Sequence, residues 1–171
     1  MSEEKIENPV TNIGAVELMD FGSPGGKFKA KLGRIGPAIG AEKLGVMVTI
    51  VEPGKIAFPF HVHHELEEMF YVIEGAGEYR FGDETYPIRE GDVLAAPTGG
   101  PDRAHQIINT SDTTLKYLAI STMGEPDVVE YPDSGKFLVY SQSDGNGPQT
   151  ARVRFIGRAD MSIGYFDGEE D

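Results

Sequence analysis

Cysteine and tryptophan are absent from this 171-residue sequence, and histidine occurs only four times. Without cysteine the chain has no disulfide, no thiolate nucleophile and no sulfur ligand for zinc or an iron–sulfur cluster. Basic residues are also few. The 15 Lys and Arg against 28 Asp and Glu give a net charge of −13, which argues against nucleic acid and anionic membranes as partners. The N-terminus lacks the basic start and the apolar run of a secretory signal, and no segment approaches the roughly 18 consecutive apolar residues of a membrane helix. We therefore expect a cytoplasmic protein.

Strand character is spread along the sequence between 22 glycines and 11 prolines, and no segment has the apolar spacing of an amphipathic helix. This pattern predicts an all-β sandwich or barrel. The length fits one domain, at residues 13–166, between acidic ends at 1–12 and 167–171 that we expect to be loosely held. Residues 141–151 are typical of a mobile loop. The runs with strand character are 27–32, 46–51, 70–73, 115–120, 137–140 and 152–156.

Two closely spaced histidines can share one face of an extended chain. Residues i and i+2 of a strand point to the same side, so His61 and His63 project together and can chelate one divalent metal. Glu68 follows five residues after His63, and a turn through 64–67 is needed to bring its carboxylate to the same side. His64, which stands beside acidic residues, is surplus to this arrangement, and we expect it to be a surface residue or a core residue with its hydrogen bonds satisfied.

The remaining histidine, His105, opens a short β-like run after a loop rich in glycine and proline. It can complete a set of three imidazoles and one carboxylate, a mixture that suits Mn, Fe, Co, Ni, Cu or Zn. The alternative is that His-x-His near a glutamate arises by chance in an acidic loop, with each histidine a surface or core residue.

The first stretch resembles the first sequence motif of the cupin family. His61-x-His63, four residues, Glu68, six residues and Gly75 match that motif, and Gly54 stands one position farther from His61 than the family pattern has it. Glu67 is a rival for the carboxylate position, but only Glu68 leaves six residues before the final glycine.

The second stretch resembles the second cupin motif. The matching residues occur in the family's order: Gly91, Pro97, Gly99, His105 and Asn109. The loop 100–104 is three residues longer than in the family pattern, so the resemblance covers the ligand set and does not extend to the rim of the site. Together the motifs cover residues 54–109, about a third of the chain.

The resemblance implies a double-stranded β-helix, a small jelly-roll-like barrel of two antiparallel sheets with one divalent transition metal at one end of its interior. It implies that the metal ligands are His61, His63, Glu68 and His105. Such proteins commonly dimerise through an N-terminal strand, so we expect a homodimer, with 27–32 and 46–51 as candidate edge strands. The sequence after the second motif is similar to small bacterial single-domain cupins described as candidate sugar-phosphate isomerases or oxalate-binding-type proteins.

This resemblance favours a metal-binding protein with a small-molecule substrate, namely an isomerase of a sugar phosphate or a similar small oxygen-rich metabolite. Two alternatives stay open. One is a dioxygenase or oxalate-decarboxylase-like enzyme that depends on Fe or Mn, and the other is a non-catalytic binding or sensing module. Neither the metal nor the catalytic residues are specified by the sequence.

Alternation along the strands predicts which side chains line the pocket beside the metal. Arg103, in the enlarged loop, is the best candidate to bind a substrate anion, and the alternative is a solvated arginine paired with Asp102. A phosphate site normally has more than one basic group or a helix N-terminus, and neither is evident. The other candidate substrate-binding residues are Phe70, Ile107 and Asn109.

Overall fold

The computed structural model describes residues 8–143 and 148–169, and β-strands and loops make up nearly all of this part of the chain. The predicted all-β fold class is therefore confirmed. Within the described ranges, no helix is long and apolar enough to cross a membrane. The predicted loose ends and mobile loop fall partly at 1–7, 144–147 and 170–171, outside the described residues.

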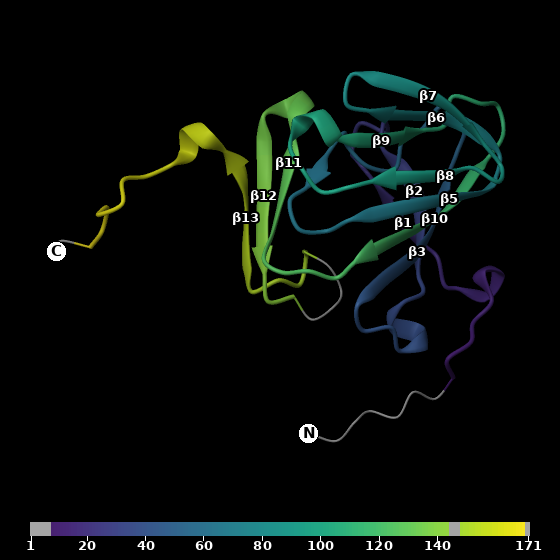
Figure 1. Cartoon of the computed structure of the whole chain (residues 1–171), viewed down its shortest axis with the longest axis horizontal. Coiled ribbons are helices and arrows are strands. Elements are labelled where there is room, and N and C mark those ends of the chain that lie inside the picture. The colour runs from purple at the N-terminus through teal and green to yellow at the C-terminus, as the bar shows by residue number, and fades with distance from the viewer. Residues whose placement is uncertain (1–7, 144–147, 170–171) are drawn as a thin grey trace.

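Two antiparallel sheets face each other as a barrel, and a third sheet stands beside it (Figure 1). The first barrel sheet has the order β1 (Met19–Gly22), β2 (Lys29–Arg34), β3 (Leu44–Val51), β10 (Leu115–Thr122), β5 (Glu68–Glu74) and β8 (Val93–Ala96). The second has the order β7 (Glu84–Arg89), β6 (Ala76–Phe81) and β9 (His105–Ile108). The third, here called the C-terminal sheet, has the order β13 (Val153–Arg158), β12 (Lys136–Ser141), β11 (Asp127–Tyr131) and β4 (Val62–His63). Short 3-10 helices are η1 (Ile13–Ala15), η2 (Pro37–Ile39), η3 (Pro101–Arg103), η4 (Pro132–Ser134) and η5 (Ala159–Met161).

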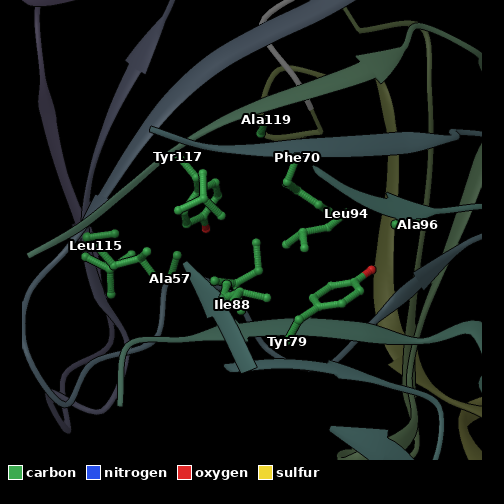
Figure 2. Close-up of a cluster of buried hydrophobic side chains, with 13 residues drawn as sticks. Ala57, Phe70, Tyr79, Ile88, Leu94, Ala96, Leu115, Tyr117 and Ala119 are labelled. Atoms are coloured by element: carbon green, nitrogen blue, oxygen red, sulfur yellow. The ribbon is translucent and has the colours of Figure 1, made fainter. Parts of the chain in front are cut away.

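Apolar side chains from the inner faces of both barrel sheets form the core (Figure 2). The predicted alternation holds in β2, where Lys29 and Lys31 are exposed and Ala30 between them is buried. At the centre of the core, the rings of Phe70 and Tyr117 meet edge to face with centroids 5.9 Å apart. These apolar side chains pack together between the two barrel sheets.

The two predicted candidate edge strands lie inside the first barrel sheet, and that part of the sequence interpretation was wrong. The segment 27–32 overlaps β2, which has β1 on one side and β3 on the other, and 46–51 belongs to β3, which is paired with β2 and β10. Among the strands that the structure describes, β1 is the outermost at this end of the sheet. An edge position depends on which strands become neighbours, and alternation within one strand carries no information about that.

Candidate metal centre

The four candidate ligands come from three backbone segments that the fold brings to one end of the barrel. His61 and His105 pair in an antiparallel bridge, in which the His105 N–H donates to the His61 carbonyl at 2.7 Å. His63 ends the short strand β4, and Glu68 begins β5. The residues between these strands form a bend without strand structure, as the sequence analysis required for Glu68 to return to the histidine side.

The imidazoles converge on one carboxylate oxygen. The Nε2 atoms of His61, His63 and His105 lie 3.8, 3.6 and 3.0 Å from Oε2 of Glu68. All four side chains are mostly buried, with exposed fractions of 3–17%. His61, Glu68 and His105 each offer a ligand atom, and these atoms lie within 4.8 Å of one another, so the group could hold a metal ion.

The donor set fits a divalent transition metal. Nitrogen and oxygen ligands at about 2.0–2.2 Å from a metal are themselves roughly 3.0–3.5 Å apart, close to the spacings between these imidazoles and Glu68. Nδ1 of His61 lies 2.7 Å from the carbonyl oxygen of Pro59, and Nδ1 of His63 lies 2.6 Å from Oδ2 of Asp127. A carbonyl only accepts hydrogen bonds, so Nδ1 of His61 carries the proton and its Nε2 lone pair faces the centre. Such partners on the outer nitrogen are typical of metal-binding histidines.

Burial and the mutual charges set the ionisation of the group. Burial, followed by the neighbouring His105, lowers the pKa of His61 to about 3. For Glu68, burial favours the neutral acid, but the hydrogen bond with His105 and the surrounding imidazoles outweigh it and lower its pKa to about 2. For His63, burial opposes the charge, yet Asp127 and Glu68 raise its pKa overall. At neutral pH, His61 is therefore neutral and Glu68 ionised, as metal ligation requires.

Aromatic side chains surround the centre. The ring of Phe70 lies 5.6 Å from that of His105, and the ring of Tyr131 stacks on that of His61 at 6.2 Å with an interplanar angle of 24°. Phe58 lies 6.4 Å from His61 on another side. A polar centre inside an apolar wall is typical of small-molecule sites.

The four candidate substrate-binding residues differ in their distance from this centre. Phe70 and Ile107 are both buried in the barrel core, and the ring of Phe70 also lies beside His105. Asn109 is fully buried, and its amide donates to the carbonyl oxygens of Val51 and Thr113 at 2.9 and 2.8 Å. Asn109 follows His105 by four positions, which is about 13 Å along an extended chain.

Arg103 lies in η3, inside the enlarged loop, and is exposed. Its Nη1 donates to the carbonyl oxygen of Thr98 at 2.9 Å, so the guanidinium is tied to the loop before it. His64, the surplus histidine, lies outside the converging group and forms a 2.6 Å pair with Glu130, with 45% of its side chain exposed.

Two residues beside the centre were not predicted from the sequence. Asp127 and Tyr131 are the first and last residues of β11, which lies beyond the two motifs at 54–109. Asp127 precedes two valines and has Glu125 and Glu130 close by in the sequence, so the sequence does not distinguish a buried carboxylate from its solvated neighbours. Only the pairing of β11 with β4 shows that both face the histidines.

Comparison with known proteins bears out the resemblance. Residues 47–121 match the family model of the cupin domain. Two crystal structures resemble nearly the whole chain. One is a candidate sugar phosphate isomerase from Acidithiobacillus ferrooxidans, with 26% identity, a TM-score of 0.76, and coverage of 91% of this chain and 96% of that one. The other is a sugar phosphate isomerase of the cupin superfamily from Silicibacter pomeroyi, with 25% identity, a TM-score of 0.75, and coverage of 93% and 98%.

Curated relatives match over shorter segments. An oxalate-binding protein of Thermotoga maritima is 33% identical over 60 residues, which cover 35% of this chain and 47% of that protein. The matched part spans between a third and a half of the length of the curated relatives. The cupin resemblance and the double-stranded β-helix predicted from the two motifs are thus confirmed.

Proposed function

We propose, from the premise of a cupin domain at residues 47–121, that this chain binds one divalent transition metal and acts as an isomerase. Its substrate would be a sugar phosphate or a similar small oxygen-rich metabolite. The proposed ligands are His61, His63, Glu68 and His105. The observation that carries the proposal is the convergence of three imidazole Nε2 atoms on one carboxylate oxygen within 3.8 Å.

A metal with these four ligands would supply Lewis-acid polarisation of a substrate carbonyl or hydroxyl oxygen. The chain's own residues prepare the site for that chemistry. Glu68 keeps its negative charge at neutral pH, and His61 keeps a free lone pair because its pKa is lowered to about 3. The rings of Phe70 and Tyr131 cover two sides of the histidines and limit the access of bulk water.

The comparisons favour isomerase chemistry because both similar structures of nearly equal length are described as sugar phosphate isomerases, one as a candidate. The oxalate-binding relative favours a second candidate, an Fe- or Mn-dependent dioxygenase or oxalate-decarboxylase-like enzyme. The third possibility is a non-catalytic binding or sensing module. A phosphate substrate would need a cation, and Arg103 is the proposed one, with its guanidinium turning from Thr98 to the ligand.

Metal content tests the centre first. Tag-free protein from unsupplemented medium should contain close to one transition-metal ion per chain by mass spectrometry, and the double variant His61→Ala, His63→Ala should contain none. His64→Ala is the matched control, because this neighbouring histidine pairs with Glu130 outside the centre, and it should keep the metal. A wild-type protein that takes up no metal, with a double variant of equal stability, would refute the centre.

Turnover then separates the reactions. An isomerase should interconvert aldose and ketose phosphates without oxygen, whereas the oxidative alternative predicts oxygen uptake with oxalate or related acids after loading with Fe or Mn. A binding module predicts thermal stabilisation by a ligand without product. The homodimer remains a prediction, and light scattering on the purified full chain tests it.

A further inference from the structure

The C-terminal sheet places a buried carboxylate against one of the proposed metal ligands. Asp127 begins β11, six residues beyond the end of the cupin-domain match, and has no exposed surface. We propose that Asp127 is a positioning residue, which holds the His63 ring with its Nε2 lone pair toward the metal. Metal binding in the barrel therefore depends on the C-terminal sheet. This inference rests on the metal centre proposed above.

Both oxygens of the carboxylate are engaged by N–H groups of one short segment. Oδ2 lies 2.6 Å from Nδ1 of His63, and Oδ1 accepts the main-chain N–H of Glu65 at 3.0 Å. A carboxylate only accepts hydrogen bonds, so the His63 proton is held on Nδ1. The lone pair of His63 is left on Nε2, which is the atom 3.6 Å from Glu68.

Main-chain pairing fixes the distance between the two side chains. His63 pairs with Val129 where β4 meets β11, and the N–H of His64 donates to the carbonyl of Val128 at 2.9 Å. The backbone and the Asp127 carboxylate thus hold the same histidine from one strand. The rotation of the ring and the position of its proton are set together, which is how outer partners of metal-binding histidines act.

A matched pair outside the centre joins Glu130 of β11 to His64, the residue that follows β4. Glu130 lies 2.6 Å from His64, but it engages Nε2, and the two side chains are 35% and 45% exposed. The chemistry and the distance equal those of Asp127 and His63, while burial and the ring nitrogen differ. Substitution of Glu130 is therefore a direct control for loss of a carboxylate–imidazole pair on β11.

The variant Asp127→Asn separates positioning from packing. An asparagine of nearly the same shape has one acceptor oxygen and one NH₂ group, and it faces two N–H donors. It can satisfy the Glu65 N–H only by pointing its NH₂ group at His63, which favours the tautomer with the proton on Nε2. That tautomer has no lone pair for the metal.

The test measures affinity for Co²⁺ or Zn²⁺ by chelator competition, with folding of each metal-free variant followed by circular dichroism. Asp127→Asn should weaken binding about 10–100-fold, the usual effect of losing such a partner. Glu130→Gln should remain within about twofold of wild type. In a His63→Ala background, Asp127→Asn should cause no further loss, because the residue acts through His63. An equal loss in both backgrounds would show a general effect on the fold and overturn the inference.

Wild-type protein supplies a measurement that needs no variant. Long-range proton–nitrogen NMR at pH 9 should show the proton of His63 on Nδ1 and that of His64 on Nε2. A His63 proton on Nε2 would overturn the inference. Wild-type protein that binds neither ion would refute the proposed centre itself, whereas tight binding by both wild type and Asp127→Asn would refute only the role of Asp127.

Discussion

Alanine at Gly75 should destabilise the fold far more than alanine at Gly91, although the two glycines have nearly the same backbone conformation. Their φ angles are +87° and +90°, in the region that L side chains rarely adopt. A Cβ atom at Gly91 would meet nothing within 4 Å. At Gly75, between β5 and β6, it would overlap the carbonyl oxygen of Thr114 and lie 3.1 Å from Cα of Leu115.

The two costs can be worked out separately. A left-handed conformation costs a non-glycine residue about 1–2 kcal/mol, and this cost applies to both variants. At Gly75 the overlapping atoms belong to the main chain at the start of β10, which is held between β3 and β5 and cannot rotate away. Displacing packed structure adds about 1–3 kcal/mol. We therefore expect a loss of about 1–2 kcal/mol for Gly91→Ala and about 2–5 kcal/mol for Gly75→Ala.

Urea unfolding of the metal-free protein measures both losses under the same conditions. The midpoint should fall with an unchanged slope in each variant, since the surface exposed on unfolding is the same. For a chain of this size each kcal/mol lowers Tm by about 2–4 °C, so a thermal melt gives an independent value. Losses that agree within about 0.5 kcal/mol would mean that the turn between β5 and β6 moves aside freely, and the steric reasoning would be wrong.

Three further outcomes are expected. Metal affinity should fall as the pH falls, because the raised pKa of His63 favours the protonated ring and the metal must displace that proton. Chelator competition at pH 6, 7 and 8 measures this, and a flat profile contradicts it. Asn109→Ala should lower the free energy of unfolding in urea by about 2–4 kcal/mol, because the buried Asn109 amide donates to two main-chain oxygens. Its metal affinity should stay within about twofold of wild type. A variant as stable as wild type would contradict this structural role. Arg103→Ala should lower the free energy of unfolding by less than about 1 kcal/mol, since the side chain is exposed and donates to the Thr98 carbonyl. The same variant should raise the KM for an anionic substrate. An unchanged KM would show that Arg103 does not bind the substrate.

Local sequence patterns were enough to predict several features of the centre. Alternation placed His61 and His63 on one side of an extended segment, and their rings lie 5.2 Å apart. The polar residues before Glu68 were compatible with the bend that is needed to return its carboxylate to these histidines. Each inference concerns residues within a few positions of one another, where the side-chain period of a strand and the chemistry of a turn decide the geometry. The resemblance to the second cupin motif then added His105.

Features that depend on pairing between distant segments could not be predicted in this way. No sequence pattern predicted the contact between Asp127 and His63, because the contact depends on the pairing of β11 with β4. Alternation predicted that Asn109 lines the pocket, whereas its amide donates to the main-chain carbonyls of Val51 and Thr113. The interior position of β2 likewise follows from the strand β1 that covers it.

The sequence by itself determined the all-β fold class, the histidine and carboxylate groups available as metal ligands, and the positions of the glycines in the two motifs. Composition, alternation and spacing are local properties, so they can be read without the fold. Only the tertiary structure decided that Gly75 is sterically confined while Gly91 is free, and that the Asp127 carboxylate of β11 lies against His63 of the neighbouring strand β4. Both outcomes depend on which backbone atoms approach from elsewhere in the chain. Pairing between strands that are distant in the sequence determines which backbone atoms come close to a given position. The residues next to that position in the sequence do not determine it.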